Sequence, residues 1–243
     1  MTEIDVICLT KTANDEIYDM CRETLKSLYD SETDIFFNTN LIESADYNEE
    51  WNYFNLASAG HWGSCNHIYA KEKFNYNRFL NIGLNYLKPR SEWIVIMNND
   101  LKFEKGWFTN IVKAYEQRPD IFSFSPFEPD FHPKYYGDTF QGDENIVEGY
   151  QVSARVCGWC IVMRKDVIRE IGQFDEKFEF WYQDNDYAEV LKSKGFKHAV
   201  VRDSQVRHLR EKSYDLLTPE ERERFTAGAR EIFMNKWYNN ENN

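Results

Sequence analysis

The sequence predicts an α/β domain with a mostly parallel central sheet flanked by helices, ending in a long C-terminal helix. Short apolar runs rich in β-branched residues alternate along the chain with segments whose apolar residues recur at helical spacing. Hydrophobic residues make up 42% of the chain and aromatic residues 16%, which is enough for a sizeable core. No repeat, Pro-rich linker or low-complexity block divides the 243 residues, so we expect a single domain over residues 1–238 and a polar tail at 239–243.

The expected strands are short apolar runs, several of which end in polar residues. They comprise residues 4–9, 34–37, 93–97, 121–125, 160–163 and 199–201. The run at 93–97 is the cleanest, because four apolar residues follow Trp93 and lead directly into Asn98. The run at 121–125 is expected to stop at Pro126, which cannot donate a ladder hydrogen bond.

The expected helices lie among these strands, at residues 14–29, 77–87, 107–117, 166–171, 184–194 and 219–238. The first is expected to be capped by Asn14, whose side chain can accept a backbone hydrogen bond from the first turn. Two others should end at Gly172 and Gly195, because glycine readily adopts the left-handed conformation that terminates a helix.

Composition excludes several classes of protein. With 29 basic and 41 acidic residues the net charge is −12, which disfavours non-specific binding to nucleic acid. No apolar run reaches the roughly 18 residues of a membrane span, and the acidic start of the chain lacks the features of a signal peptide. We therefore expect a soluble, cytoplasmic protein without a transmembrane segment. Five cysteines, an odd number, argue against a disulfide framework.

Polar residues at the carboxyl ends of the expected strands are the first candidates for a binding site, because ligands of parallel α/β sheets bind there. Three such groups occur, at residues 10–12, 38–40 and 98–100. In the third group, Asp100 closely follows a buried strand and could hold Mg²⁺ or Mn²⁺, which prefer oxygen ligands. The alternative is an ordinary turn, in which Asn and Asp are common.

A second cluster of carboxylates lies at the start of the helix expected at 184–194. Asp184 follows Trp181 and Tyr182, and an aromatic wall could desolvate its carboxylate, raise its pKa and make it a general base. The alternative is that Asp184 and Asp186 only stabilise the positive end of the helix dipole.

His208 is a candidate ligand beside a carboxylate and a diphosphate, because neutral imidazole binds divalent metals. The segment after it carries Arg210 and Lys212, which could close over phosphate groups. The alternatives are a structural histidine and a solvated loop. The sequence has no Gly-rich phosphate loop and no nucleophile elbow, and Cys157 and Cys160 lack the following helix of a redox site.

Four stretches of the sequence are specific in combination. The first is the opening strand, which ends in Thr10, and the second is the segment at residues 75–84, which includes Asn-Ile-Gly-Leu. The third is the segment at residues 93–107, in which Asn98-Asn99-Asp100 ends a strand and Gly-Trp begins a helix.

The fourth stretch is the segment at residues 158–178, which contains Gly-Gln-Phe-Asp-Glu and leads to Gln183-Asp184. In this order the four resemble glycosyltransferase family 2, the inverting enzymes of the GT-A fold, with its DxD-type and Glu-Asp motifs. The resemblance covers most of the chain, from about Ile4 to His208. It implies a GT-A type nucleotide-binding domain.

The resemblance further implies transfer of a sugar from a nucleoside-diphosphate sugar, with a UDP-sugar expected, to an acceptor hydroxyl, with Mn²⁺ or Mg²⁺ as cofactor. It implies that Asp100 and His208 are metal ligands and that Asp184 is the base that deprotonates the acceptor. Nucleotide-sugar contacts are expected at Thr10, Thr12, Asn38, Asn40, Arg78, Asn98, Asn99, Arg210 and Lys212. Acceptor contacts are expected at Trp159, Trp181, Tyr182 and Asp186.

The sequence departs from the family pattern at three places. Asn98 stands at the first position of the DxD motif, which implies weaker metal binding, and Gln183 replaces the Glu of the Glu-Asp motif, which leaves Asp184 to act alone. Asn38-Thr39 stands where the family usually has Asp-Asp, so the donor's nucleobase stays open. These losses leave open a non-catalytic sugar-nucleotide-binding or scaffold protein on a decayed GT-A fold.

Two further alternatives concern the reaction and the acceptor. A nucleotidyltransferase is disfavoured by the lack of a Gly-rich basic loop near residue 12. The acceptor is expected to be a glycan or glycolipid, with residues 126–150 as its binding loop. A hydroxylated DNA base is a less favoured acceptor, because it needs a local basic patch within residues 202–230 to offset the net charge of −12.

Overall fold

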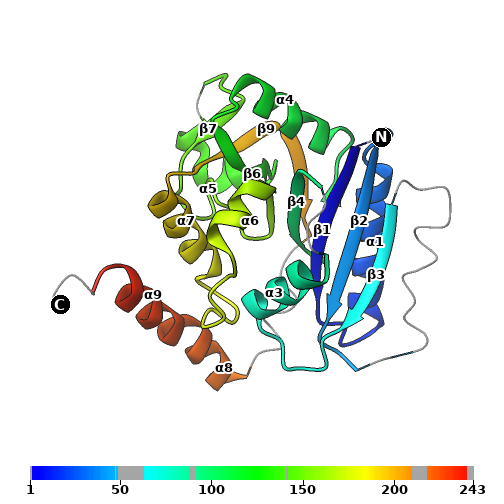
Figure 1. The fold of residues 1–243 in the computed structure, drawn as a ribbon, viewed down its shortest axis with the longest axis vertical. Helices are drawn as coiled ribbons and strands as arrows, with labels where there is room; N and C mark the ends of the chain where they lie inside the picture. The colour runs from blue at the N-terminus through cyan, green and yellow to red at the C-terminus, as the bar shows by residue number, and fades with distance from the viewer. Residues whose placement is uncertain are drawn as a thin grey trace.

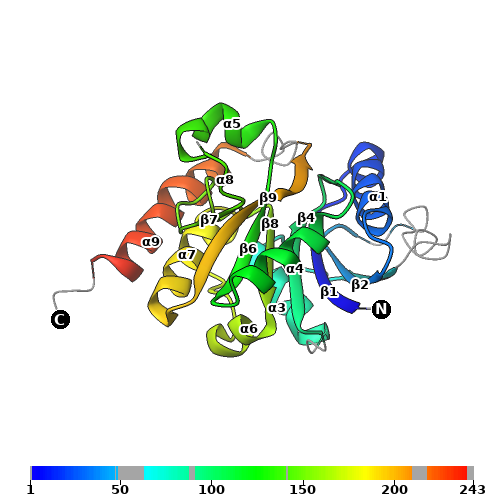
Figure 2. The ribbon, with the colours of Figure 1, turned by 90° about the horizontal axis from the view of Figure 1, so that it is seen from above.

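A computed structural model describes residues 2–46, 48, 63–87, 91–140, 142–209 and 218–239. It has an α/β fold with a mixed, mostly parallel sheet and helices on both faces (Figures 1 and 2). In sheet order the strands are β3 (Gly63–Tyr69), β2 (Ile35–Glu43), β1 (Thr2–Thr10), β4 (Trp93–Asn98), β8 (Cys160–Arg164), β6 (Ile121–Phe127), β9 (Lys197–His208) and β5 (Leu101–Phe103), and β7 (Ile146–Glu148) also pairs with β9. The described helices are α1 (Asp15–Asp30), α3 (Tyr76–Leu87), α4 (Trp107–Gln117), α5 (Phe131–Tyr136), α6 (Lys165–Ile171), α7 (Gln183–Lys194), α8 (Pro219–Glu223) and α9 (Ala229–Trp237).

The strands β3, β2, β1 and β4 are all parallel, so their carboxyl ends lie at one edge of the sheet. Thr10 at the end of β1 is level with Glu43 in β2, and Leu9 is level with Asn98 in β4. The other half of the sheet is mixed, because β8 is antiparallel to both β4 and β6, whereas β9 runs parallel to β6. The short β5 is antiparallel to the end of β9.

The core has a main cluster on each face of the sheet, because successive residues of a strand point to opposite faces. Val6 and Cys8 of β1 belong to the cluster that includes α1 and α4, whereas Ile7 and Leu9 belong to the cluster that includes α3 and α7. Figure 2 shows α1 and α3 on opposite sides of the sheet. All five cysteines are buried and none forms a disulfide.

Several predicted helix signals are confirmed. Asn14 precedes α1, and its side chain accepts a hydrogen bond from the Ile17 N–H at 3.0 Å. The helix expected at 107–117 has those bounds, and α7 ends at Gly195 in a left-handed conformation. Among the described helices, none is long and apolar enough to cross a membrane.

The strand expected at 34–37 is too short, because β2 continues beyond it and contains Asn38 and Asn40. These residues therefore do not follow the strand. Their side chains bond across neighbouring strands: Asn38 Nδ2 donates to Asp5 Oδ1 at 3.3 Å, and Asn66 Nδ2 donates to Asn40 Oδ1 at 3.0 Å. Such bonds satisfy polar groups that would otherwise disfavour a buried strand.

Two other expectations need correction. Pro126 lies within β6 instead of ending it, next to a register shift at Phe127 where a missing N–H is tolerated. The single helix expected at 219–238 is divided into α8, a π-helical turn at Arg224–Gly228, and α9. The short β5 and β7, as well as β3 and α5, were not predicted.

We expect Gly83→Ala to destabilise the fold by about 1–3 kcal/mol through overpacking. Gly83 lies where α3 meets β1, and a Cβ atom there would lie 2.7 Å from Cγ2 of the buried Ile7. The matched control is Gly228→Ala, because a Cβ atom at that helical position meets nothing within 4 Å. It should stabilise the fold by up to about 1 kcal/mol. Urea unfolding measures both, and equal stabilities would contradict the tight contact between α3 and β1.

Candidate active site

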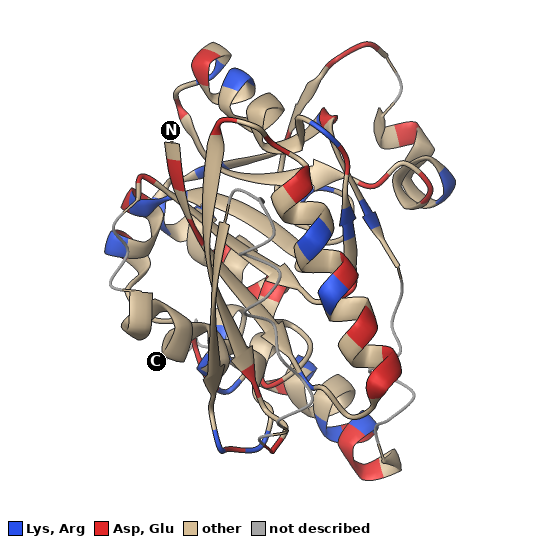
Figure 3. Ribbon diagram, turned by 90° about the vertical axis from the view of Figure 1, so that its right-hand side faces the viewer, with Lys and Arg blue, Asp and Glu red and all other residues tan. Residues whose placement is uncertain are grey.

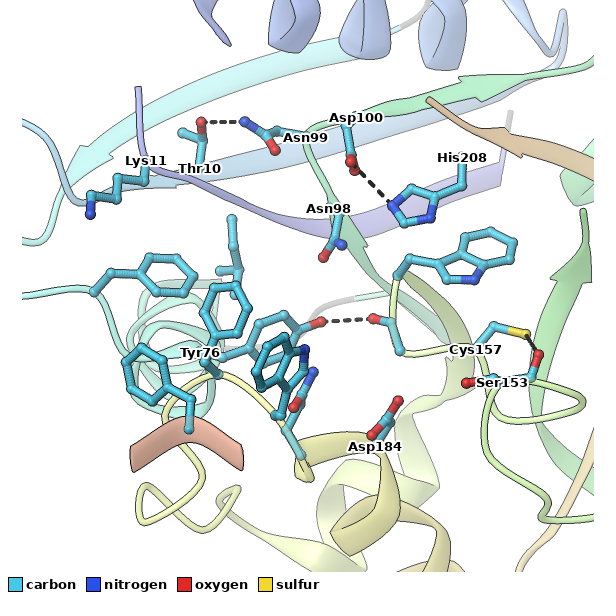
Figure 4. A pocket seen from close by; sticks show the side chains of 18 of the residues that line it. Thr10, Lys11, Tyr76, Asn98, Asn99, Asp100, Ser153, Cys157, Asp184 and His208 are labelled. Carbon is cyan, nitrogen blue, oxygen red and sulfur yellow. Dashed lines mark hydrogen bonds and ion pairs between the residues drawn. The ribbon is translucent and has the colours of Figure 1, made fainter. Parts of the chain in front are cut away.

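A cavity of about 390 Å³ lies at the carboxyl ends of β1 and β4. Its walls also come from the segment before β8, the start of α7, the end of β9 and the C-terminal helices (Figure 4). The sequence-predicted residues that line it are Thr10, Asn98, Asn99, Asp100, Trp159, Trp181, Asp184 and His208. The first four come together because the parallel register aligns the two strand ends.

Asp100 and His208 are brought together by the pairing of β5 with β9. Leu101 pairs with His208, and the Leu209 N–H donates to the Asp100 carbonyl at 2.8 Å. As a result, His208 Nε2 lies 3.1 Å from Asp100 Oδ2. The His208 ring stacks on Trp159 with ring centroids 5.7 Å apart, which orients the imidazole.

These two side chains fit part of a divalent metal site. Asp100 is 6% exposed, and its Oδ1 is buried without a hydrogen-bond partner among the described residues. A buried carboxylate oxygen of this kind is suited to a hard cation, and imidazole is also a common ligand. Within the described part of the chain, no group of three or more metal-binding side chains occurs, so the remaining ligands would be phosphate oxygens and water.

The turn from Asn98 to Asp100 is fixed by its neighbours. Asn99 Nδ2 donates to Thr10 Oγ1 at 2.7 Å, and the Asn99 carbonyl accepts from Thr24 Oγ1 at 2.8 Å. The Asn98 N–H donates to the Trp159 carbonyl at 2.9 Å. Figure 4 shows the Asn98 side chain pointing into the middle of the cavity, where a ligand between the strand edge and α7 would meet it.

Asp184 lies across the cavity from Asp100, in the first turn of α7 (Figure 4). Burial raises the pKa of Asp184 to about 6, and the Asn185 N–H, which donates to Asp184 Oδ1 at 2.9 Å, offsets only part of this shift. Gly158 permits the close packing, because a Cβ atom there would lie 3.0 Å from Asp184 Oδ2. A carboxylate with a pKa just below neutrality is suited to accept a proton from a hydroxyl group.

Aromatic rings form one wall of the cavity. Phe180 stacks on Phe225 with ring centroids 5.4 Å apart and contacts Trp181 at 5.3 Å. The Tyr76 hydroxyl donates to the Gly158 carbonyl at 2.8 Å, and burial raises the pKa of Tyr76, so this phenol stays neutral. Trp181 thus belongs to an aromatic wall of the same cavity as Asp184, whereas the other ring that was expected to desolvate Asp184, that of Tyr182, packs on Phe233.

Three predicted nucleotide contacts lie away from the cavity. Asn38 and Asn40 lie within β2, where each side chain forms a cross-strand hydrogen bond, although Asn40 Nδ2 has no partner among the described residues. Arg78 forms ion pairs on the surface of α3 with Glu72 and, at 3.1 Å, with Glu176. Its charge is therefore already matched by carboxylates outside the cavity.

Two predicted acceptor contacts also lie elsewhere. Tyr182 packs on Phe233 with ring centroids 5.4 Å apart. Asp186 is buried and accepts hydrogen bonds from Lys236 at 3.0 Å and Trp237 at 2.7 Å. Both side chains face α9, and neither belongs to the described lining of the cavity.

Arg210 and Lys212 lie outside the described residues, and two other cations line the cavity. Lys11 directly follows β1, and Lys73 precedes α3 and forms an ion pair with Glu221 at 3.1 Å. Sequence reasoning missed Lys73 and included Lys11 only within the polar group at residues 10–12, without assigning it a contact. The signal for Lys11 is its position at the end of the first strand, between Thr10 and Thr12, which were both expected to contact the nucleotide.

Glu43 is a buried carboxylate beside the site that sequence reasoning also missed. It ends β2, is fully buried and lies level with Thr10. Its carboxylate accepts hydrogen bonds from Thr12 Oγ1 at 2.5 Å, the Thr12 N–H at 3.0 Å and the Ala45 N–H at 2.7 Å. Burial raises the pKa of Glu43. Thr12 is thus engaged in fixing the loop after β1 and does not line the cavity, contrary to the expected nucleotide contact.

The sequence matches no family model and no curated protein. Among solved structures, the chain is similar to the mannosyltransferase PcManGT from Pyrobaculum calidifontis in complex with GDP-Man and Mn²⁺, with a TM-score of 0.64 and 14% identity. This match covers 86% of the chain and 57% of the mannosyltransferase.

Two further structures show the same likeness. TarS 1–349 from S. aureus matches with a TM-score of 0.59 and 10% identity, over 85% of this chain and 59% of TarS. GalNAc-T7 with UDP, GalNAc and Mn²⁺ matches with a TM-score of 0.63 and 12% identity, over 95% of this chain and 51% of GalNAc-T7. The chain thus spans between half and three-fifths of the length of these structures. They are GT-A glycosyltransferases, and the predicted GT-A type α/β fold is confirmed.

We expect Asp184→Asn to stabilise the protein above pH 6 and to have little effect near pH 4. The folded pKa of about 6 exceeds the ordinary value of about 3.9, so folded Asp184 binds its proton more tightly and stability is lost as pH rises through this window. The gain in the variant should reach about 1–3 kcal/mol. Thermal unfolding between pH 4 and 8 measures it. The exposed Asp19→Asn is the control, and an equal pH dependence in both variants would show that Asp184 is not desolvated.

Proposed function

We propose that this chain is a metal-dependent inverting glycosyltransferase, which moves a sugar from a nucleoside-diphosphate sugar to an acceptor hydroxyl. One observation carries the proposal: two carboxylates with different surroundings face one cavity at the sheet edge of a GT-A fold. Asp100 lies beside His208, whereas Asp184 lies beside Gly158 with a raised pKa. The first arrangement suits a cation and the second suits a base.

On the donor side, Asp100 and His208 would hold Mn²⁺ or Mg²⁺, which supplies a Lewis acid for the leaving diphosphate. Lys11 and Lys73 would contact phosphate oxygens, since both line the cavity. The mannosyltransferase structure contains GDP-Man and Mn²⁺, and the GalNAc-T7 structure contains UDP and Mn²⁺, which supports a metal-dependent nucleotide-sugar donor. A UDP-sugar is the donor that we propose to test first.

On the acceptor side, Asp184 would take the proton of the acceptor hydroxyl while the hydroxyl oxygen bonds to the anomeric carbon. The bond from that carbon to the diphosphate breaks, and the diphosphate leaves on the opposite side, so the configuration at the anomeric carbon inverts. The Asn185 N–H holds the carboxylate of Asp184. Because Gln183 is neutral and cannot relay a proton, Asp184 acts alone.

The acceptor would enter beside Asp184, where Trp159 and Trp181 line the cavity and offer flat faces for stacking. A glycan or glycolipid is the acceptor class that we propose. Segments within the expected acceptor loop at 126–150 also reach the cavity, through Glu128, Asp130 and Phe131.

A hydroxylated DNA base is the less favoured acceptor, because the net charge is −12 and two arginines of the required basic patch are already paired with carboxylates. Arg207 forms ion pairs with Glu104 and Asp130, and Arg224 forms one with Glu179. On the side of the molecule that carries α1, Figure 3 shows acidic positions interspersed with basic ones along that helix. A phosphate backbone gains little from such surfaces.

The neutral residues Asn98 and Gln183 favour one alternative, a non-catalytic sugar-nucleotide-binding or scaffold protein. Such a protein would bind the donor and show no turnover. Separate measurements of binding and of turnover therefore distinguish the two functions.

We expect one nucleoside diphosphate among UDP, GDP, CDP and TDP to raise the unfolding temperature in the presence of Mn²⁺ and to have no effect in EDTA. When the concentration of this diphosphate is 100 times its dissociation constant, the unfolding temperature should rise by about 5–10 °C. Asp100→Asn and His208→Gln should abolish the metal-dependent part, because both would remove a ligand. Asp138→Asn, outside the described cavity lining, is the control. A shift that survives in Asp100→Asn would contradict the metal assignment.

We expect Asp184→Asn to bind the same diphosphate normally and to lose at least roughly 100-fold in kcat for sugar transfer. In the wild type, kcat should rise with pH up to about 6, as Asp184 loses its proton. Gly158→Ala should also lower kcat, because its methyl group displaces the carboxylate. Product analysis with UDP-sugars and a panel of glycan acceptors measures both variants. Full turnover in Asp184→Asn would sink the assignment of the base.

A further inference from the structure

The helix α9 contacts α7 and the residue that precedes it, both before and after Asp184 in the chain. Before Asp184 in the chain, Tyr182 packs on Phe233 of α9 with ring centroids 5.4 Å apart. After it, Asp186 bonds to side chains at the end of α9. Side chains of α9 therefore hold the residues that lie two positions before and two positions after Asp184 in the chain.

The contact at Asp186 is buried and uses both carboxylate oxygens. Asp186 is 4% exposed, its Oδ1 accepts from Trp237 Nε1 at 2.7 Å, and its Oδ2 accepts from Lys236 Nζ at 3.0 Å. The same ammonium donates to Asp175 Oδ2 at 2.9 Å, and Asn77 Nδ2 of α3 donates to the Asp175 carbonyl at 2.8 Å. One ammonium thus joins α9 both to α7 and to the segment that leads into α7.

The start of α7 depends on such contacts because it has no side-chain cap. The residue that precedes the helix, Tyr182, has a left-handed backbone with a φ angle of 65°, and its side chain makes no capping hydrogen bond. A non-glycine residue in this conformation persists only where its surroundings hold it. The packing of Tyr182 on α9 and the bonds to Asp186 supply that restraint.

We propose that Lys236 and Trp237 are positioning residues, which hold Asp184 in the cavity through their bonds to Asp186. The consequence for catalysis rests on the proposed function, in which Asp184 is the base. Neither Lys236 nor Trp237 belongs to the described lining of the cavity, so they act through α7 and not by contact with a substrate. Displacement of a catalytic group by about 1 Å lowers a rate by roughly 100-fold.

The pKa of Asp184 separates positioning from direct electrostatics. Removing the charge of Lys236 alone would raise this pKa, because a nearby cation favours the carboxylate. Loss of positioning would instead expose Asp184 to water and lower its pKa toward the ordinary value of about 4. Among the groups near Asp184, Tyr76 of α3 and Cys157 before β8 stay neutral, because burial raises the pKa of each.

The test uses Trp237→Phe and the double variant Asp186→Asn/Lys236→Met, which removes both charges of the most buried pair and leaves only the partly exposed Asp175 without this cation. In each, the pKa of Asp184 is measured from the pH dependence of the unfolding temperature, with the matching Asp184→Asn variant as reference. We expect this pKa to fall from about 6 toward 4. We also expect kcat for sugar transfer to fall at least roughly tenfold, with the KM for the donor unchanged.

Two controls bracket this result. Lys236→Arg keeps a cation that can pair with both carboxylates, so it should retain most of the wild-type kcat. Lys192→Met removes a lysine from α7 that pairs with Glu189 at 2.6 Å on the surface, so it should change neither the pKa of Asp184 nor kcat. Folded Trp237→Phe and double variants with an unchanged pKa and unchanged kcat would overturn the proposal. A lower unfolding temperature as the sole effect would also overturn it, because the contact would then be purely structural.

The pKa measurement does not require turnover, so the two proposals fail separately. If the wild type transfers no sugar and the pKa of Asp184 still falls in both variants, the proposed function fails and the positioning role stands. If the wild type is active and both variants keep its kcat and the pKa of Asp184, the positioning role alone fails.

Discussion

The parallel register of β1 with β2 and β4 is the constraint on which the rest of the site depends. It brings Thr10, Glu43 and Asn98 to one edge of the sheet, and Asp100 leaves that edge through the turn after β4. A shift of one residue would turn each side chain of β4 to the other face. It would also move Asp100 away from His208, which reaches the same edge from β9. The register of the strands therefore determines which side chains line the cavity.

Two of the carboxylates that line the cavity, Asp100 and Asp184, have different surroundings. Asp100 lies beside an imidazole, whereas Asp184 packs against Gly158 in a cavity that aromatic residues also line. The two carboxylates belong to opposite walls of the cavity. Asn98 and Gln183 are neutral, which keeps the negative charge of the cavity lower than acids at these two positions would.

Sequence patterns predicted the features that depend on local signals. The strand that ends at Asn98 and the cap at Asn14 are examples, because a few neighbouring residues decide them. The strand β2 continues past Asn38, whose side-chain amide forms a hydrogen bond to the neighbouring strand. Asp100 meets His208 through the three-residue strand β5. Both features depend on distant parts of the chain, so neither has a local sequence signal. Asp184 and Asp186 were both placed in the site, although residues two apart on a helix point to nearly opposite sides.

The pairing of β5 with β9 has a consequence for how the protein is made on the ribosome. The nascent chain presents Asp100 early, yet its partner strand emerges only with residues 197–208. Contacts between such distant segments form late in folding, because a long loop must close first. A partly synthesised chain would therefore hold the parallel strands and lack the imidazole. The pairing of Asp100 with His208, on which the proposed cation site depends, would therefore form only after residues 197–208 have been synthesised.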